Sequence, residues 1–403
     1  MPNPLDGYRV ADLGQVWAGP VLAHLLGDMG AEVIRIESRA GTDIMRQIST
    51  DPSEIRKALE ANFVYRNRTC VTLNFTKPEG VELVKELVKH CDIVIENFSP
   101  RVLQKFGLQY EALREVKPDL IMVSMSAAGQ YGPYRDLLGY GPSINSVSGV
   151  DSMVGYFGGD RLMVNVWDAD PTTAVTAAFA VLAALHYKER TGQGQYIDLS
   201  FYEALTSLVG EGHMDYSMNG RIAQPQGNRH PSMAPHGIYP CAGHDKWVSI
   251  AVKTQEEWLA FVQAVGPSEQ GWTQEERFAD LFGRLGHRDE LDERVSQWTR
   301  RHSNYDVMHT LQAHGVAAAV VATLEDVYLD PHDQHRRTSL RIEDSRLDAQ
   351  DVVHGIPWHL SETPGAIFKL APAMGEDNQT VFRDMLGMAD DEVQRLIDDQ
   401  VIY

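Results

Sequence analysis

Cysteine is scarce in this sequence, and secretory and membrane signals are missing from it. Cys70, Cys91 and Cys241 are the only three cysteines and no two are spaced as CxxC, which argues against a disulfide scaffold or a cysteine-rich metal site. Ala177–Leu185 is one of the longest apolar runs, far below the roughly 20 residues that a membrane-spanning helix needs. The segment from Met1 has no basic region followed by an apolar one. We therefore expect a cytoplasmic protein with reduced thiols.

Positive charge is also in short supply. The chain has 36 Lys and Arg against 56 Asp and Glu, a net charge of -20. A surface field of that sign disfavours nucleic acid and anionic membranes, so we expect neither as a partner. Only locally is the balance reversed, because residues 61–78 hold Arg66, Arg68 and Lys77 and no acidic residue. Two interpretations of this stretch stay open, a solvated charged face and a pocket for a phosphate-bearing ligand.

Several common chemical motifs are missing. There is no GxGxxG after a predicted strand and no GxxxxGK[ST], which disfavours a dinucleotide oxidoreductase or a P-loop protein. There is no HExxH and no GxSxG, which disfavours a zinc protease and an α/β-hydrolase. The 15 histidines are dispersed, and His230, His236 and His244 lie close together without paired spacing. We expect no metal and no permanently bound cofactor.

Strands alternate with helices over the first 125 residues or so. Short apolar runs predict strands, and amphipathic segments at 20–29, 78–88 and 101–117 predict the helices between them. This order is typical of a mostly parallel α/β sheet. The predicted strands are Arg9–Leu13, Glu32–Glu37, Thr69–Phe75, Asp92–Phe98 and Leu120–Ser126.

The rest of the chain suggests a second, smaller unit. A loop-rich stretch at 129–160 precedes a long Ala-rich helix at 171–190 and a strand at 196–200. The segment 220–240 contains four prolines and three glycines, which is typical of a linker. After it, strands at 247–253 and 315–322 flank helical segments and predict a small α+β domain. An amphipathic helix at 390–399 ends the chain.

An ordered set of segments carries a family resemblance. They include LDGYRVADLGQVWAGPVLAHLLGDMGAEVIRIE from Leu5, IVIENFSPRVLQKFGLQYEAL from Ile93, GQYGP from Gly129, DPTTAVTAAFAVLAALHYKERTGQGQYIDL from Asp170 and LSETPGAIFKLAPAMGEDN from Leu360. In this order and spacing the chain resembles the class III CoA-transferases, the family of formyl-CoA transferase and crotonobetainyl-CoA:carnitine CoA-transferase. The resemblance covers about residues 5–400.

The resemblance implies a fold and an assembly. It implies a large Rossmann-like domain built from both chain ends, a second, smaller α+β domain, and an interlocked homodimer. On this basis we expect residues 1–220 to form the first part of the large domain. Residues 221–330 are expected to form the linker and small domain, and residues 331–403 to return to the large domain. A hetero-oligomer with a related subunit is an open alternative.

The resemblance also implies a nucleophile, Asp170, at the start of the Ala-rich helix. From the residues alone, Asp170 followed by Pro171 predicts a helix N-cap. The two roles are compatible, because a carboxylate facing helix N–H groups is held ionised. Asp168 is the rival position. The implied reaction moves CoA from an acyl-CoA thioester, with succinyl-CoA as a plausible donor, to a carboxylic acid through an aspartyl mixed anhydride.

By position, the resemblance carries CoA contacts onto several residues. Formyl-CoA transferase has glutamine at the position of Trp17 and arginine at that of Ser38, so the oxalate/formate pair fits poorly and Arg39 is the replacement cation. Arg46 and Arg135 are candidate cations for a dicarboxylate, and His230 is a candidate pocket residue. The implied CoA-binding residues are Trp17, Arg39, Leu73, Asn97, Phe98, Lys105 and Tyr140.

Two other functions stay open. An α-methylacyl-CoA racemase shares this family's fold and needs a histidine base, but the matching segment Gly139–Asn145 has Tyr140 there. A phenol of pKa about 10 is a poor base at neutral pH. A non-catalytic CoA-binding subunit is the second alternative, and Asp170 argues against it.

Overall fold

The computed structural model describes residues 3–41, 43–47, 62–164, 168–344 and 349–403, in two compact units. The first unit comprises Met1–Val150, Val164–Met214 and Gln334–Tyr403. The second comprises Asp151–Met163 and Asp215–Asp333. The sequence had not assigned Asp151–Met163 to a small unit.

A six-stranded sheet forms the centre of the first unit. Its order is β3-β2-β1-β4-β5-β6, and every neighbouring pair is parallel. This order, which reverses between β1 and β4, is that of a doubly wound Rossmann-type sheet. The α/β class with a parallel sheet is therefore confirmed. The strands are β1 (Arg9–Asp12), β2 (Glu32–Glu37), β3 (Arg68–Thr72), β4 (Ile93–Glu96), β5 (Ile121–Ser126) and β6 (Tyr196–Ser200).

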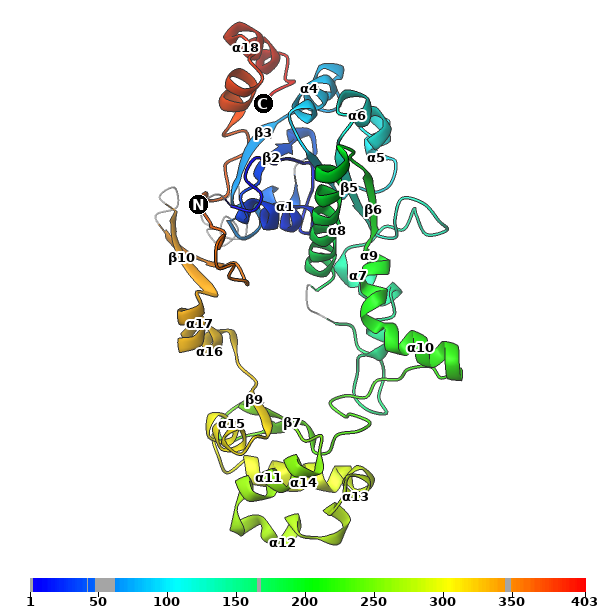
Figure 1. The fold of residues 1–403 in the computed structure, drawn as a ribbon, viewed down its shortest axis with the longest axis vertical. Helices are drawn as coiled ribbons and strands as arrows, with labels where there is room; N and C mark the ends of the chain where they lie inside the picture. The colour runs from blue at the N-terminus through cyan, green and yellow to red at the C-terminus, as the bar shows by residue number, and fades with distance from the viewer. Residues whose placement is uncertain (1–2, 42, 48–61, 165–167, 345–348) are drawn as a thin grey trace. The chain divides into compact units, whose positions relative to one another are not determined.

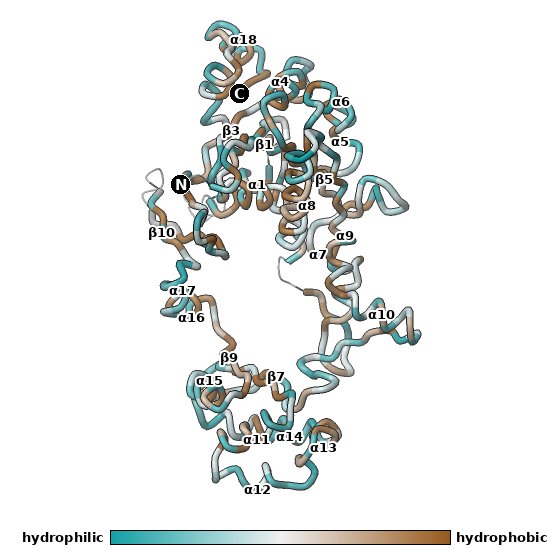
Figure 2. Tube along the Cα trace, viewed as in Figure 1, coloured by the Kyte–Doolittle hydropathy of each residue, from teal (hydrophilic) through white to brown (hydrophobic). Residues whose placement is uncertain are grey.

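The central strands are apolar because helices cover both faces of the sheet. Every residue of β4 and β5 is buried, and parallel strands covered on both sides have near-continuous hydrophobic runs. Figure 2 shows hydrophobic colouring at the sheet and a mainly hydrophilic α18 (Asp390–Asp398).

One face of the sheet carries α1 (Ala18–Asp28) and the long α8 (Ala169–Thr191), which pack against each other (Figure 1). Leu22 and Leu26 of α1 and Ala177 and Val181 of α8 belong to one buried cluster with Val10 of β1. The alanines of α8 let the two helices approach closely.

The opposite face joins distant parts of the chain. Val84 of α4 (Pro78–Lys89) and Leu113 of α6 (Tyr110–Val116) share a buried cluster with Phe382 and Leu396. Phe382 lies in η6 (Gln379–Met385) and Leu396 in α18, so residues from both ends of the chain build one core. The remaining elements assigned mainly to this unit are η1 (Arg39–Gly41), α2 (Ile44–Gln47), α5 (Val102–Lys105), α7 (Gly141–Val147), α9 (Phe201–Thr206), η3 (Ser207–Val209), β10 (Ser339–Asp344) and β11 (Ala349–His354).

The second unit has an antiparallel three-stranded sheet, β7-β8-β9, around an aromatic core. Trp258, Phe261 and Trp298 are among its buried residues. The prediction that all of 220–240 is linker is wrong at its end, because His236–Pro240 forms β7 and pairs with β8. Two helices, α10 (Gly210–Asn219) and α17 (Pro331–Arg336), are divided equally between the two units. The elements of the second unit are η2 (Asp151–Met153), β7 (His236–Pro240), β8 (Trp247–Ala251), α11 (Gln255–Val265), η4 (Pro267–Glu269), α12 (Gln270–Thr273), η5 (Glu276–Phe278), α13 (Leu281–Gly286), α14 (Arg288–Thr299), α15 (Asn304–Ala313), β9 (Ala317–Val320) and α16 (Leu324–Leu329).

None of the helices in the described ranges combines the length and the apolar character that crossing a bilayer requires.

Candidate active site

The loops that follow β1 and β4 meet at the point where the strand order reverses. Asn97, directly after β4, accepts a hydrogen bond from the Gln15 N–H at its Oδ1 (2.7 Å). Its Nδ2 donates to the Gln15 carbonyl oxygen (2.9 Å). Open parallel sheets bind their ligands at this crevice, outside the carboxyl ends of the strands. The two loops therefore form one rigid wall of a candidate site.

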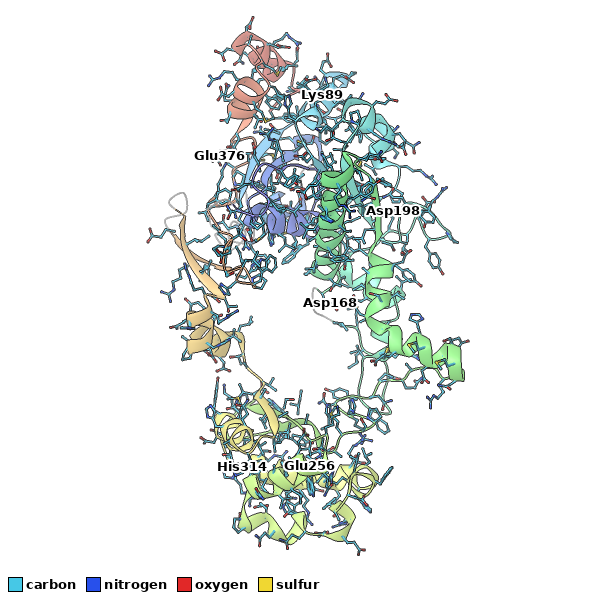
Figure 3. All side chains as sticks on the ribbon, viewed as in Figure 1. Lys89, Asp168, Asp198, Glu256, His314 and Glu376 are labelled. Atoms are coloured by element: carbon cyan, nitrogen blue, oxygen red, sulfur yellow. The ribbon has the colours of Figure 1, made fainter. Side chains whose placement is uncertain are left out.

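Asp170 lies beside this wall, in the first turn of α8. The helix begins at Ala169 and Asp168 occupies the N-cap position, so the prediction of Asp170 as N-cap is wrong by two positions. Pro171 still lies in the first turn, where its missing N–H costs no helical hydrogen bond. Figure 3 labels the neighbouring Asp168 at this end of α8.

The Asp170 carboxylate is held between two other helix N-termini. The backbone N–H of Ala18, the first residue of α1, lies close enough to this carboxylate to lower its pKa. A Cβ added to Gly141, the first residue of α7, would lie only 2.8 Å from Asp170 Oδ2, so the carboxylate packs directly on that glycine. A side chain at position 141 would therefore push the Asp170 carboxylate aside.

The pKa of Asp170 is raised to about 6, mainly by burial and to a smaller extent by the nearby Asp168. The N–H groups of Ala18 and of Asp170 itself act in the opposite direction. The side chain is half-buried, so it is partly desolvated and still reachable. At neutral pH this carboxylate is ionised yet less solvated than a surface aspartate, which suits a nucleophile.

Asp168 has a different environment. Its Oδ1 accepts a hydrogen bond from Nδ2 of Asn145 (2.8 Å), a residue of α7 with no exposed surface. This contact joins the start of α8 to α7 and holds Gly141 against Asp170. Asp168 is thus occupied in fixing the two helices.

Three of the predicted CoA-binding residues lie around Asp170. Trp17 precedes Ala18, and its ring packs on Phe63 with the centroids 5.3 Å apart. Tyr140 precedes Gly141 and is 72% exposed. Asn97 holds the Gln15 backbone in the same loop as Trp17. Trp17 and Tyr140 thus adjoin in the chain the two residues that lie against Asp170, and Asn97 is bonded to the loop that carries Trp17.

The other four predicted residues follow neighbouring strands. Arg39 is exposed after β2, with its guanidinium 5.8 Å from the Tyr403 ring centroid. Leu73, after β3, has no exposed side-chain surface and belongs to the core. Phe98 is half-buried against the same core, and Lys105 is exposed at the end of α5. The structure does not bring these four into contact with Asp170.

The arginines of the basic stretch 61–78 lie neither on a solvated face nor in a phosphate pocket. Arg66 pairs with Asp28 (2.6 Å) and Arg68 with Asp12 (2.7 Å), and each of these four residues is at most 2% exposed. Both interpretations of these arginines are therefore wrong. Their charges are neutralised inside the protein.

The other candidate cations and His230 are also engaged elsewhere. Arg46 is bonded to Glu37 (3.1 Å), and Arg135 lies 3.5 Å from the carboxylate of Asp136. His230 belongs to the second unit, where its Nδ1 accepts a hydrogen bond from the Ser232 N–H (3.2 Å).

Sequence reasoning missed Glu96, the last residue of β4. It is 4% exposed, and burial raises its pKa to about 7. It accepts hydrogen bonds from the Phe98 N–H (2.8 Å) and from Ser124. The signal available was an acidic residue ending an apolar strand, in the motif IVIENF.

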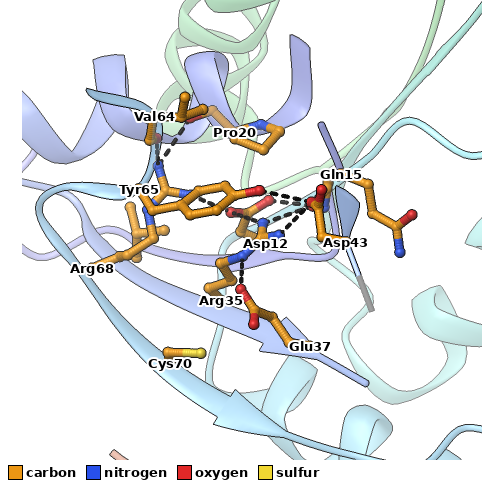
Figure 4. A network of polar contacts seen from close by, with 12 residues as sticks. Asp12, Gln15, Pro20, Arg35, Glu37, Asp43, Val64, Tyr65, Arg68 and Cys70 are labelled. Atoms are coloured by element: carbon orange, nitrogen blue, oxygen red, sulfur yellow. Dashed lines mark hydrogen bonds and ion pairs between the residues drawn. The ribbon is translucent and has the colours of Figure 1, made fainter. Parts of the chain in front are cut away.

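It also missed the buried charges beneath the β1–α1 loop. Asp12 ends β1 and Arg35 lies between two isoleucines of β2, and a charged residue beside apolar strand residues was the available signal. Figure 4 shows them in a network with Asp43 and Tyr65. Within this network, Asp12, Arg35 and Asp43 are bonded directly to the loop that leads to Ala18.

A half-open cavity of about 430 Å³ lies at the ends of β5 and β6. Its lining includes Tyr131, Tyr134, Asp198, Tyr202 and Glu203. Burial raises the pKa of Asp198, which accepts hydrogen bonds from the Gln130 N–H (3.0 and 3.1 Å). The acidic lining disfavours a phosphate group there.

Among the residues that the structure describes, no three His, Cys, Asp or Glu side chains are arranged to hold a metal ion. The chemistry available at this site is therefore that of a carboxylate, backbone N–H groups and aromatic walls.

Known proteins resemble this chain over its whole length. The model of CoA-transferase family III matches residues 5–378. A succinyl-CoA–D-citramalate CoA-transferase of Chloroflexus aurantiacus is 34% identical over 401 residues, covering 100% of this chain and 98% of that protein. The beta subunit of a succinyl-CoA–L-malate CoA-transferase from the same species is 33% identical, covering 99% and 98%.

A solved structure agrees with these relatives. A CAIB/BAIF family protein from Brucella suis is 28% identical and superimposes with a TM-score of 0.84, covering 96% of this chain and all of that one. The parallel sheet, the family match and the full-length relatives lead to one conclusion. This chain belongs to CoA-transferase family III and is a CoA-transferase.

Proposed function

We propose that Asp170 is the nucleophile that carries CoA from an acyl-CoA thioester to a carboxylic acid. The observation that supports this most directly is its carboxylate, which is half-buried, lies near the Ala18 N–H and has a pKa raised to about 6. It is ionised at neutral pH without being fully hydrated, so it is available to attack a carbonyl carbon.

The reaction then runs in four balanced steps. Asp170 attacks the thioester carbonyl, and the C–S bond breaks to leave a mixed anhydride and the CoA thiolate. The thiolate attacks the Asp170 carbonyl, which releases the donor acid and leaves an aspartyl-CoA thioester. The acceptor carboxylate attacks this thioester, forming a second anhydride and freeing the thiolate again. The thiolate attacks the acceptor carbonyl, and the Asp170 carboxylate is restored with no net proton change.

The Ala18 N–H is suited to assist these steps. It is the first free donor of α1, where the aligned peptide dipoles favour negative charge. When the Asp170 carbonyl is attacked, negative charge develops on its oxygen. A fixed donor at that oxygen stabilises the charge without reorganisation, as an oxyanion hole does.

CoA contacts at Trp17, Arg39, Leu73, Asn97, Phe98, Lys105 and Tyr140 form part of the same proposal. The strands and loops that carry these residues meet at the carboxyl edge of the sheet, where open parallel sheets bind their ligands. Arg39 and Lys105 are exposed cations able to meet phosphate charge. Leu73 is fully buried, so its contribution in this conformation is through the backbone.

Succinyl-CoA is the proposed donor and a 2-hydroxydicarboxylate the proposed acceptor. The two relatives named above carry succinyl-CoA in their names, with D-citramalate or L-malate as the other acid. Both acceptors are hydroxylated dicarboxylates. Since the transfer needs only a carboxylate at the reacting end, the second carboxylate and the hydroxyl serve recognition.

An interlocked homodimer is the proposed assembly, with 1–220 and 331–403 in the large domain and 221–330 in the linker and small domain. Val175, Phe179 and Leu182 on α8 are 58%, 77% and 47% exposed at helical spacing. An apolar stripe of this kind on a long helix favours a covering chain. A related second subunit is the alternative, since one relative is named a beta subunit.

Isotope exchange tests the chemistry without knowledge of the acceptor. Wild-type protein incubated with succinyl-CoA and labelled succinate should form labelled succinyl-CoA, and Asp170→Ala should not. Hydroxylamine added during turnover should leave a hydroxamate at Asp170. Asp168→Asn is the matched control and should keep exchange activity. Full exchange by Asp170→Ala would refute the nucleophile.

The racemase alternative has its own test. It requires deuterium uptake at the α-carbon of a branched acyl-CoA without exchange of CoA between acids. Deuterium uptake in the absence of succinate exchange would replace the proposed function.

A further inference from the structure

Buried side chains hold the backbone between β1 and α1 at three successive residues. The Gly14 N–H donates to Asp12 Oδ1 (2.8 Å), and the Gly14 carbonyl accepts from Arg35 Nη1 (2.7 Å). The Gln15 N–H and carbonyl are both bonded to Asn97. The Val16 N–H donates to Asp43 Oδ2 (2.9 Å). The course of this loop is thus fixed from outside the loop.

Val16 needs such a restraint. Its φ is 61°, in the left-handed region, although valine is β-branched. A β-branched residue rarely adopts that conformation, because its Cβ substituents crowd the backbone. Strain of this kind persists only where the surroundings enforce it, and it is concentrated at functional sites.

Asp43 supplies the restraint at Val16. It is 5% exposed, and its carboxylate accepts four hydrogen bonds. Besides Val16, Oδ2 accepts from Arg35 Nη2 (2.9 Å) and the Tyr65 hydroxyl (2.8 Å), and Oδ1 accepts from the Met45 N–H (3.0 Å). Figure 4 shows Asp43 with Arg35 and Tyr65. A buried carboxylate with four donors is immobile, so it can act as a fixed anchor for Val16.

The loop leads directly to the reacting group. The N–H of Ala18, two residues after Val16, lies close enough to the Asp170 carboxylate to lower its pKa. We infer that Asp43 is a positioning residue for the transfer reaction, acting through the strained Val16 backbone to aim the Ala18 N–H at Asp170. The inference rests on the proposed role of Asp170 as nucleophile.

Loss of this anchor has a defined consequence. Without the bond to Asp43, Val16 returns to a negative φ and the Ala18 N–H turns away from Asp170. That N–H opposes the rise in the pKa of Asp170 that burial causes, so the pKa climbs above its present value of about 6. The donor for the developing oxyanion is lost in the same movement.

The main test is Asp43→Ala in the full-length protein, assayed by exchange between succinyl-CoA and labelled succinate. We expect kcat to fall about 10- to 100-fold, the range for a displaced catalytic group. The KM for succinyl-CoA should stay within about twofold, because the buried Asp43 has no surface for CoA. The acid limb of the kcat/KM profile should move to higher pH, which a merely structural role would not produce.

Glycine at position 16 provides a rescue. Glycine adopts positive φ without strain, so Asp43→Ala/Val16→Gly should regain much of the lost kcat and return the acid limb toward its wild-type position. Tyr65→Phe is the matched control. It removes another donor from the same Asp43 oxygen and leaves Val16 bonded, so exchange should be unchanged within about twofold.

If Asp43→Ala does not fold, Val16→Pro tests the positioning role of Asp43 in its place. Proline removes the N–H that Asp43 accepts and fixes φ near -65°, while every buried charge remains. It should reproduce the fall in kcat and the shift of the acid limb. A folded Val16→Pro or Asp43→Ala protein with wild-type kcat and acid limb would overturn the inference. If these variants stay active while Asp170→Ala is inactive, only the positioning role fails. If Asp170→Ala is active, the proposed nucleophile fails.

Discussion

Gly141 and Asp170 are in direct contact across two helix N-termini: a Cβ built on Gly141 would lie 2.8 Å from Asp170 Oδ2. Any side chain larger than that of glycine would collide with the Asp170 carboxylate at position 141 unless the carboxylate rotates. The contact places Oδ2, an oxygen of the proposed nucleophile, against the backbone of Gly141. It also makes the pair a sensitive point for mutation.

Gly141→Ala should therefore lower exchange activity without harming the fold. The atom in the way is the end of a side chain, so Asp170 turns aside at little cost, while alanine favours the helix α7 by up to about 1 kcal/mol. We expect kcat to fall about 10- to 100-fold and the melting temperature to hold or rise. Gly210→Ala is the matched control, since a Cβ at that helical position meets nothing within 4 Å. Wild-type exchange by Gly141→Ala would show that the carboxylate position is not critical.

The pH dependence of transfer should follow the ionisation of Asp170. Its pKa is raised to about 6, and only the ionised form attacks. Exchange activity should be level above pH 6 to 7 and fall about tenfold per unit below pH 6. A level profile down to pH 4.5 in stable protein would contradict this assignment.

The same raised pKa predicts a gain in stability on Asp170→Asn. The folded pKa lies above the unfolded value of 3.8, so ionisation disfavours the fold, fully above pH 6 and not at all below pH 3.8. The variant should unfold with a free energy higher by on the order of 1–3 kcal/mol at pH 7.5, and the gain should shrink toward pH 4. Chemical denaturation at the two pH values measures this. A loss of stability at pH 7.5 would mean that Asp170 supports the fold.

Phe179→Glu on α8 tests the proposed assembly. Phe179 is 77% exposed in the middle of the apolar stripe, and a charge buried in an interface is costly. We expect light scattering to show a shift from dimer toward monomer, with loss of exchange activity in parallel. Gln394→Glu, on the exposed side of α18, is the control and should leave the mass of the assembly, measured by light scattering, unchanged. A monomeric wild-type protein, or a Phe179→Glu variant that stays dimeric, would contradict the proposal.

The strands of the sheet could be predicted from the sequence, but the burial and the partners of the charged residues could not. The six strands of the large sheet were expected because a strand covered on both faces must be apolar throughout, and that pattern is local. The partners of Arg66 and Arg68 are not local, since Asp28 and Asp12 lie about 40 and 56 residues away. A buried, paired arginine and a solvated one have the same letter, so composition alone misplaced both.

For Asp170 too, part of the prediction came from the sequence and part depends on residues that are distant in the chain. Its importance came from the resemblance, and its contact with Ala18 and Gly141 depends on three helix N-termini that meet only in the folded chain. The N-cap was misassigned because Asp168 and Asp170 are chemically equivalent in the motif DADP. The start of the helix depends on Asn145, which binds Asp168 from another helix.

His24→Leu should make the protein less sensitive to acid. His24 is 1% exposed, and its ring lies 5.5 Å from that of His354, near Arg66 and Arg68. Burial and these positive charges hold the pKa of His24 well below 6.5 and that of His354 at about 4. Because the unfolded chain binds the proton more readily, each histidine costs stability as pH falls below 6.5, by about 1.4 kcal/mol per unit until its folded pKa is reached.

The comparison with wild type isolates this effect from the carboxylates that titrate in the same range. The gain in unfolding free energy of His24→Leu over wild type should grow steadily from pH 7 to pH 4.5, as measured by chemical denaturation. His186→Leu, at an exposed position of α8, should show no such growth. A constant difference between His24→Leu and wild type across this range would mean that His24 binds its proton equally well in the folded and unfolded chain, contrary to its burial beside two arginines.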